Sequence, residues 1–198
     1  MRRVAKLKTK TINRYPTMKS SIVRKSLAGA LALFVSVALG FAQAAKKPAV
    51  GETAPPVAGK NQAGKTWKLA DAIAQKKIVL LYFYPKDDTP GCTKEACGLR
   101  DRMGDLKKDN VEVVGVSFDS AERHQQFIEK YTLNFALLAD TDGKIADAYG
   151  VRAPGKNVAR RVSFLIGSDG KIAHVTDSPQ ADVHLSEMTE AVAKLKKN

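Results

Sequence analysis

The chain has 198 residues and a net charge of +13, with 33 Lys and Arg against 20 Asp and Glu. A charge of that size can indicate nucleic-acid binding, but nine of the basic residues lie in the first 44 residues, where no acidic residue occurs. The remainder has 24 basic and 20 acidic residues of mixed order, which is typical of a solvated surface and argues against a nucleic-acid partner. Two cysteines are too few for a fold held together by disulfides.

Residues 1–44 are predicted to be a leader that contains a cleavable signal peptide. The apolar run Leu27–Phe41 has the length of a signal-peptide core and is shorter than the roughly 20 residues that span a membrane. Small residues precede the expected cleavage point after Ala44, so we expect an exported, periplasmic protein without a stable membrane anchor. The basic segment before the run is unusually long, which makes Met18 an alternative start. A disordered basic arm and an organelle transit peptide are rival interpretations.

Residues 45–198 have the length of one domain, and their apolar runs predict strands that alternate with helices. The segment up to Ala58 is expected to be an extended arm. The elements expected after it are a short strand within Gly64–Leu69, a brief helix ending at Ala74, strand Ile78–Tyr84, helix Pro90–Asp109, strand Val111–Ser117, helix Ala121–Tyr131, strand Phe135–Ala139, a short helix between Asp142 and Gly150, strands Arg161–Gly167 and Lys171–Thr176, and helix Val183–Lys196. This order predicts an α/β protein with a thioredoxin-like fold, in which helices cover both faces of a mainly parallel central sheet. A turn at Asp169-Gly170 makes the last two strands a C-terminal antiparallel hairpin.

Both cysteines lie at the start of the helix expected over Pro90–Asp109, directly after a buried strand and a turn. Thr89 is a suitable N-cap and Pro90 suits the first helical position, which puts Cys92 in the first turn. There the unpaired N–H groups and the positive end of the helix dipole favour the thiolate, the nucleophilic form of a cysteine. Taken alone, each residue has an ordinary explanation, because Thr-Pro-Gly often begins helices and a cysteine on an apolar helix face is often a small core residue.

Pro85, Thr89 and Cys92 together form the pattern Pro-x-x-x-Thr-x-x-Cys, and with it the chain resembles the peroxiredoxins. The longer run Tyr82–Cys97 is similar to the bacterioferritin-comigratory, or Q-type, subfamily, in which the second cysteine follows the first by five residues. The resemblance covers most of residues 50–198.

The resemblance implies a thiol-dependent peroxidase of the thioredoxin-dependent, atypical two-cysteine type, which reduces hydrogen peroxide and organic hydroperoxides. The Cys92 thiolate would attack the hydroperoxide and become a sulfenic acid, which Cys97 would resolve as an intramolecular disulfide. Arg161 would stabilise the thiolate and the charge that develops on the peroxide. Thr89 would bond to the thiolate or the peroxide, and Pro85 would shape the pocket. No cofactor and no metal are expected.

Arg160 competes with Arg161 for the catalytic role. Neighbouring residues of a strand face opposite sides of the sheet, and the family's register favours Arg161. Without such roles, Arg161 would be a surface cation and Pro85 a strand terminator. The segment Arg152–Ala159, just before, is shorter than in the family.

The spacing of the two cysteines sets a geometric requirement. Five residues along a helix give a rise of about 7.5 Å and a rotation of about 140°, so the Cα atoms of Cys92 and Cys97 are expected to lie roughly 8–9 Å apart. A disulfide tolerates a Cα separation of about 7 Å. The first turns of the helix must therefore unwind before the thiols can join, and Gly98 would lower the cost of unwinding.

The other polar residues near the site are predicted to have no chemical role. The three histidines of the chain are His124, His174 and His184. None has metal-ligand spacing to the cysteines, so all three are expected at the surface or in ordinary packing. Asp87, Asp88 and Glu95 are expected to be solvated charges, although Glu95 could tune access to the thiol.

Two other functions remain open. An exported thiol–disulfide oxidoreductase would need two residues between its cysteines, whereas four separate them here. A copper-binding thioredoxin-like module would pair closely spaced cysteines with a distant histidine such as His174, but it would give Thr89 and Arg161 no purpose. Each peroxidase turnover leaves a disulfide, so a thioredoxin-like or glutaredoxin-like reductant outside the cytoplasm is the expected partner. The subfamily also suggests a monomer.

Overall fold

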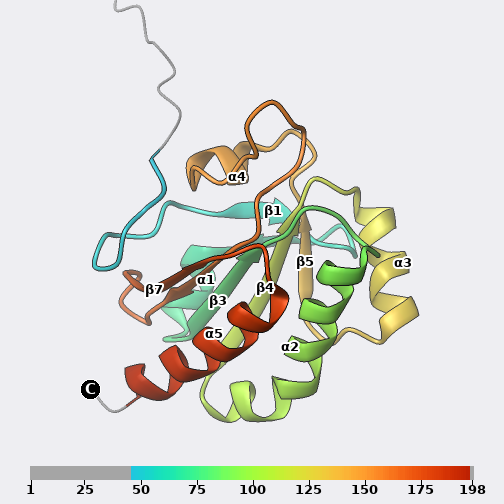
Figure 1. The fold of residues 1–198 in the computed structure, drawn as a ribbon. Coiled ribbons are helices and arrows are strands. Elements are labelled where there is room, and N and C mark those ends of the chain that lie inside the picture. The colour runs from blue at the N-terminus through green and yellow to red at the C-terminus, as the bar shows by residue number, and fades with distance from the viewer. Residues whose placement is uncertain (1–45, 197–198) are drawn as a thin grey trace, which may run out of the picture. The chain divides into compact units, whose positions relative to one another are not determined.

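The computed structural model describes residues 46–196 (Figure 1), so the predicted leader, its cleavage point and the alternative start at Met18 lie outside the described residues. A five-stranded sheet forms the centre of the domain, in the order β5-β4-β3-β6-β7. Its strands are β3 (Ile78–Phe83), β4 (Val111–Ser117), β5 (Ala136–Ala139), β6 (Val162–Ile166) and β7 (Ile172–Asp177). The helices are α1 (Leu69–Ala74), α2 (Pro90–Lys108), α3 (Ala121–Tyr131), α4 (Lys144–Ala148) and α5 (Ala181–Leu195).

The sheet has a parallel half and an antiparallel half. β3 runs parallel to β4, and β4 runs parallel to β5. β6 pairs with β3 in the antiparallel direction, and β7 pairs with β6 in the same way. The thioredoxin-like α/β layout and the C-terminal antiparallel hairpin are therefore confirmed. The hairpin joins the sheet beside its central strand, so the sheet is mixed.

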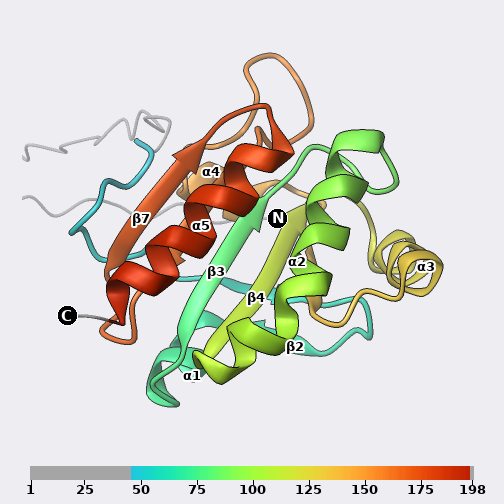
Figure 2. The same cartoon turned by 60° about the horizontal axis from the view of Figure 1, so that its bottom comes forward.

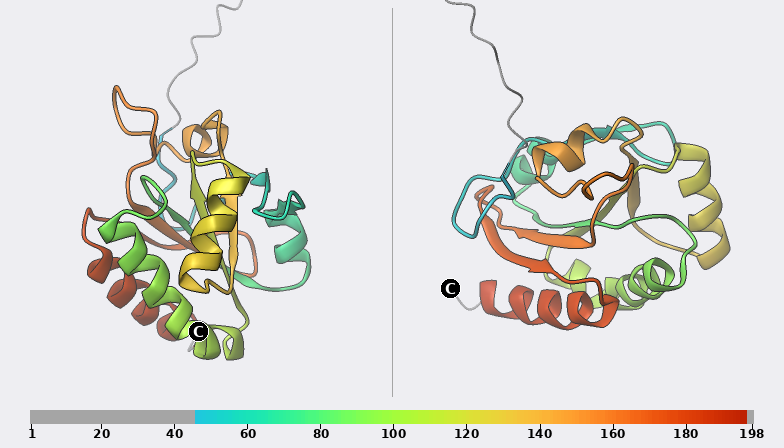
Figure 3. Two further views of the ribbon diagram at one scale, coloured as in Figure 1. Left: turned by 90° about the vertical axis from the view of Figure 1, so that its right-hand side faces the viewer. Right: turned by 45° about the horizontal axis from the view of Figure 1, so that its top comes forward.

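Helices cover both faces of the sheet, which explains why its central strand is apolar throughout. Alternate residues of β3 point to opposite sides: Leu80 and Tyr82 pack with α2 and α5, whereas Leu81 and Phe83 pack with α1 and α4. Figure 2 shows α2 and α5 side by side across β3 and β4. In the right-hand view of Figure 3 these two helices lie on one side of the sheet and α4 lies on the other.

The segment before β3 is more ordered than the predicted arm. Gly51 donates a backbone hydrogen bond to Ile172, at the start of β7. β1 (Ala58–Lys60) then pairs with β2 (Thr66–Lys68) as a small antiparallel hairpin. The Trp67 indole on β2 donates a 2.7 Å hydrogen bond to Glu112 on β4 and so ties this hairpin to the sheet.

Between Lys46 and Lys196, no helix has the length and apolar character needed to cross a membrane.

Candidate active site

The reactive thiol lies where the chain passes from the carboxyl end of β3 into α2. Thr89 takes an extended conformation as the N-cap, Pro90 begins the helix, and Cys92 is its third residue. The Cys92 thiol is only 1% exposed, and its sulfur accepts a 3.2 Å hydrogen bond from Nη2 of Arg161. A cationic donor and the first turn of a helix both favour the thiolate form of a cysteine.

Arg161 lies immediately before β6 and uses each nitrogen of its guanidinium. Nη2 faces Cys92, Nη1 donates to the carboxylate of Glu95, and Nε donates to the Pro179 carbonyl at 3.2 Å. A side chain at Gly91 would bring its Cβ to 3.1 Å from Nη2, so the glycine leaves room for this approach. Arg160 points elsewhere and binds Asp177 at 2.8 Å. Of the two candidate arginines, the structure brings Arg161 to the thiol, as the register predicted.

Glu95 is buried, which corrects the expectation of a solvated charge. It lies one helical turn after Cys92 and is 1% exposed. Burial raises the pKa of Glu95 to about 7 and outweighs the opposing effect of Arg161. One carboxyl oxygen, Oε2, faces Arg161. The other, Oε1, has no hydrogen-bond partner among the described residues and lies 3.6 Å from Nδ1 of His184.

His184, on α5, closes the far end of this arrangement and is 2% exposed. Its Nδ1 lies 2.7 Å from the Ser163 hydroxyl, and its Nε2 lies 2.8 Å from the Ser178 carbonyl. His184 is therefore a buried member of the site and more than a packing residue. We call Cys92, Glu95, Arg161, Ser163 and His184 the thiol cluster.

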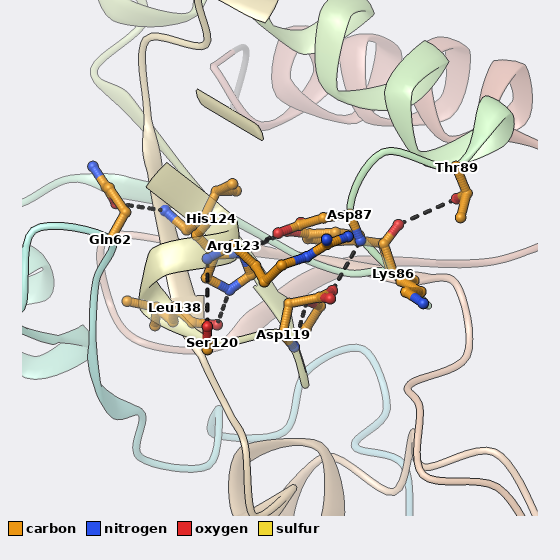
Figure 4. Close-up of polar contacts among 12 residues, drawn as sticks. Gln62, Lys86, Asp87, Thr89, Asp119, Ser120, Arg123, His124 and Leu138 are labelled. Carbon is orange, nitrogen blue, oxygen red and sulfur yellow. Dashed lines mark hydrogen bonds and ion pairs between the residues drawn. The ribbon is translucent and has the colours of Figure 1, made fainter. Parts of the chain in front are cut away.

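A second buried group fixes the loop between β3 and α2 (Figure 4). Asp87, 2% exposed, accepts a 2.7 Å hydrogen bond from the Tyr84 hydroxyl. Its other oxygen lies 2.8 Å from Nδ1 of His124. Its backbone N–H donates to Asp119 at 2.8 Å, and Nε2 of His124 lies 3.1 Å from the Leu138 carbonyl. Asp87 was expected in solvent and is buried instead. We call Tyr84, Asp87, Asp119 and His124 the loop cluster.

The neighbouring Asp88 remains at the surface but holds the same loop to α3. Its backbone has a φ of 58°, in the left-handed region that few residues with a side chain adopt. Its two carboxylate oxygens accept hydrogen bonds from Lys130 at 2.7 Å and from the Tyr131 hydroxyl at 2.6 Å. These bonds, with those of Asp87, hold the turn that delivers Thr89 and Pro90 to the start of α2.

Within the described residues neither a hydrogen bond nor a disulfide links Thr89 or Cys97 to the Cys92 sulfur. The Thr89 hydroxyl donates to the Lys86 carbonyl at 3.1 Å, and no hydrogen bond links it to Cys92 in the described chain. Cys97 is half-buried and free, and α2 is continuous from Pro90 to Lys108. The helix thus holds the two thiols unbridged. Gly98 has a packing role as well, because an added Cβ would lie 2.4 Å from Leu185 on α5.

A pocket with a volume of about 410 Å³ opens beside Pro85 and Arg161. The segment Arg152–Ala159 forms one wall of the pocket. An isolated antiparallel β-bridge between Arg152 and Ala159 joins the two ends of this segment. The remaining lining residues are Arg160, Asp177, Ser178 and Pro179. From Lys46 to Lys196, no group of three or more His, Cys, Asp or Glu side chains is arranged to hold a metal ion.

For one of the buried polar residues that were expected in solvent or in ordinary packing, the sequence did contain a signal of burial. Glu95 follows Cys92 by three residues and so shares the inward face of the helix with it, as the buried Ala96 and Leu99 also do. A charged residue on that face requires a buried partner. His184 and the pair Asp87–His124 carried no such signal, because their partners are distant in the sequence.

Comparisons with known proteins agree with this geometry. The model of the AhpC/TSA family matches residues 50–175. Peroxiredoxin Bcp of Escherichia coli (strain K12) is 44% identical over 140 residues, which cover 68% of this chain and 88% of that protein. Peroxidoxin BcpB from Mycobacterium tuberculosis has a TM-score of 0.68 and 30% identity, over 76% of this chain and 97% of that one. The Xanthomonas campestris bacterioferritin comigratory protein, described for its alkyl peroxide reduction activity, has a TM-score of 0.65 and 25% identity, over 70% and 90% of the two chains.

Proposed function

The chain belongs to the AhpC/TSA family, among its bacterioferritin-comigratory (Q-type) peroxiredoxins, and is a thiol peroxidase; on that premise we propose that it reduces hydrogen peroxide and organic hydroperoxides through Cys92, with Cys97 as the resolving residue. The observation that carries the proposal is the 3.2 Å contact between Arg161 and the Cys92 sulfur at the first turn of α2. Family membership leaves the oxidoreductase and copper-binding alternatives without support.

The first step is attack of the Cys92 thiolate on one oxygen of the hydroperoxide. The O–O bond breaks, the sulfur is oxidised to a sulfenic acid, and the leaving oxygen takes a proton to depart as water or an alcohol. Arg161 favours the thiolate before the attack and faces the negative charge that develops during it. Pro85 lines the pocket beside Arg161, so it would shape the approach of the substrate. The Thr89 hydroxyl would have to turn from the Lys86 carbonyl to reach the peroxide.

In the second step the Cys97 thiol attacks the sulfenic acid, a disulfide forms, and water leaves. Because α2 is continuous through both residues, the start of the helix must unwind for this attack. A dithiol then reduces the disulfide and returns the enzyme to its starting state. A thioredoxin-like or glutaredoxin-like protein is the class of reductant that supplies such a dithiol.

We include organic hydroperoxides among the proposed substrates because of the pocket beside Arg161. Its walls include apolar groups of Ala153, Val158 and Pro179, which can contact the carbon chain of an alkyl hydroperoxide. Alkyl peroxide reduction is also the activity described for the Xanthomonas campestris relative. Hydrogen peroxide is smaller and needs only the thiol and Arg161.

We further propose that residues 1–44 direct export to the periplasm and that the enzyme works there as a monomer. The support is the apolar run Leu27–Phe41, followed by small residues before Ala45. Fractionation of cells that produce the full chain tests the location. Recovery of the protein in the cytoplasmic fraction at full length would contradict export, and sedimentation as a dimer would contradict the monomer.

Peroxide consumption by the purified chain with several dithiol reductants tests the chemistry. Mass spectrometry after one equivalent of peroxide is expected to show a Cys92–Cys97 bridge that forms rapidly and stoichiometrically. Cys92→Ser is expected to abolish both bridging and consumption, whereas Cys97→Ser is expected to leave a sulfenic acid on Cys92 that a dimedone probe captures. Peroxide consumption that survives Cys92→Ser would refute the proposal.

A further inference from the structure

The thiol cluster extends beyond the arginine to a buried histidine whose hydrogen atoms can be assigned. The Ser178 carbonyl can only accept, so Nε2 of His184 must carry the hydrogen of that 2.8 Å bond. Burial lowers the pKa of His184, which leaves the ring uncharged at neutral pH. Nδ1 therefore presents a lone pair, and the Ser163 hydroxyl donates to it at 2.7 Å.

Nδ1 also lies close to the unpartnered oxygen of Glu95. Nδ1 of His184 and Oε1 of Glu95 are 3.6 Å apart, and both side chains are at most 2% exposed. With His184 uncharged, the Nδ1 lone pair repels Oε1 if Glu95 is ionised, whereas a protonated Glu95 can turn its hydrogen toward Nδ1. A buried carboxylate oxygen without a hydrogen bond is also costly. The contact therefore favours the protonated form of Glu95, which shares the lone pair with the Ser163 hydroxyl.

The state of Glu95 matters to the thiol because Arg161 serves both groups. Nη1 faces the Glu95 carboxylate and Nη2 faces the Cys92 sulfur. With Glu95 ionised, one guanidinium charge is divided between two anions. With Glu95 protonated, the charge acts on the thiolate alone.

We propose that His184 is a positioning residue of the thiol site: its Nδ1 favours the protonated form of Glu95, and so it governs how Arg161 divides its charge between Glu95 and the Cys92 thiolate. This inference rests on the proposed peroxidase function. His184 acts through Glu95 and touches neither substrate nor sulfur.

The other titratable groups near this contact either stay uncharged or bind other partners. Tyr82, from β3, stays uncharged because burial raises its pKa well above the ordinary value. Glu187, one turn further along α5, accepts a 2.7 Å hydrogen bond from Thr176. Asp177, from β7, binds Lys47 and Arg160. The pair Glu95–His184 is the part of the cluster that remains to respond to pH.

The test is the rate at which iodoacetamide alkylates Cys92 between about pH 5 and 9, in the full chain with Cys97→Ser. The parent profile is expected to show a second inflection near pH 7, where Glu95 ionises. Glu95→Gln is expected to remove that inflection. His184→Leu is expected to move it downward by about one pH unit, because protonated Glu95 loses its acceptor and ionised Glu95 loses the repulsion of the Nδ1 lone pair. His184→Asn keeps a polar atom at the place of Nδ1 and is expected to restore it to within a few tenths of a unit.

The matched control is His174→Leu, which removes a half-exposed histidine that pairs with Glu187 outside the cluster. Its profile is expected to superimpose on the parent. Should His184→Leu fail to fold, Ser163→Ala tests the contact in the opposite sense: it frees the Nδ1 lone pair for protonated Glu95, so a smaller upward shift is expected. A parent profile without the second inflection, or a His184→Leu profile that matches the parent, would overturn the proposal. Alkylation needs no peroxide, so loss of peroxide consumption in the parent would refute the peroxidase function while leaving this result readable.

Discussion

The two buried polar groups beside α2 differ in how completely their hydrogen bonds are made. In the loop cluster both oxygens of Asp87 and both ring nitrogens of His124 have partners. In the thiol cluster one oxygen of Glu95 has none within residues 46–196, and the Arg161 guanidinium is shared between Glu95 and Cys92. In the loop cluster Tyr84, Asp87 and His124 are buried and Asp119 is half-buried, and all residues of the thiol cluster are buried, so burial alone does not explain the difference.

We infer from this difference that the loop cluster supports the fold, whereas the thiol cluster takes part in the chemistry. A fully bonded buried cluster has one favoured arrangement and rigidifies the segment that it holds. In the thiol cluster the unpaired oxygen belongs to Glu95, whose pKa is raised, and buried groups with shifted pKa values gather at functional sites. Changes in the loop cluster should therefore act mainly on stability, and changes in the thiol cluster mainly on reaction rate.

The largest effect is expected from Arg161→Ala. The thiolate and the peroxide both lose their cationic partner, so the second-order rate of Cys92 oxidation by hydrogen peroxide should fall between about 10²- and 10³-fold. Trapping of the sulfenic acid in single turnovers measures this rate. Arg102→Lys, an exposed change on α2, the helix that carries Cys92, serves as the control and should leave the rate within about twofold. If the rate for Arg161→Ala equals that of the control, the thiol cluster does not act mainly on reaction rate and the proposed distinction between the two clusters is wrong.

The loop cluster should respond in the opposite sense. Asp87→Ala and His124→Leu each strand a buried partner, so each is expected to lower the free energy of unfolding by about 3 kcal/mol. The double variant leaves neither Asp87 nor His124 without the other and should lose clearly less than the sum. Urea denaturation followed by circular dichroism measures all three. Strict additivity, or a tenfold loss of peroxide rate in a folded variant, would show that the loop cluster takes part in the chemistry.

Glu95 should make stability depend on pH. Its pKa is raised from 4.5 to about 7 in the folded chain, so between these values the folded state binds more protons than the unfolded state. Stability should therefore fall as pH rises through this window, by on the order of 2–3 kcal/mol, and stay level above it. The difference in unfolding free energy between the parent and Glu95→Gln, measured by urea titration from about pH 4 to 8, isolates this contribution. A difference that does not change with pH would show that the pKa of Glu95 is the same in the folded and the unfolded chain.

The smallest effect concerns the contact between α2 and α5, the helices that carry the thiol cluster's Glu95 and His184. In Gly98→Ala the new Cβ would meet Leu185 at 2.4 Å, and the resulting strain should cost about 1–2 kcal/mol of stability. Gly104→Ala is the matched control, since no atom lies within 4 Å of its added Cβ and the better helix propensity should stabilise it by up to about 1 kcal/mol. Thermal melts of both variants suffice, and equal shifts of the same sign would exclude the steric contact.

Sequence patterns predicted most of the fold, because the helices and strands have strong local signals. β4 and α3 begin and end at the predicted residues, and α2 ends one residue early. The strand β1 was missed, since Ala58-Gly59-Lys60 has no apolar alternation and forms only through its pairing with β2. The mixed character of the sheet depends on where β6 pairs, which no local pattern encodes.

The site was predictable where the motif is local. Thr89, Pro90 and Cys92 form the helix start as expected, and the structure brings Arg161 beside the thiol. Their catalytic roles stay predictions. The spacing along α2 places Glu95 on the inward face, but its partner could not be read from the sequence, because it is an arginine 66 residues away. The same holds for Asp87, whose histidine partner is 37 residues away.

The hydrogen bond between Trp67 and Glu112 has a practical consequence. Trp67 is the only tryptophan of the chain, and its indole is bound near the start of β4. The active-site end of that strand, at Ser117, is five residues and about 17 Å further along. The intrinsic fluorescence of the protein should therefore follow the detachment of the β1–β2 hairpin and stay silent when Cys92 is oxidised. Tryptophan fluorescence should therefore measure unfolding of the native chain independently of its redox state.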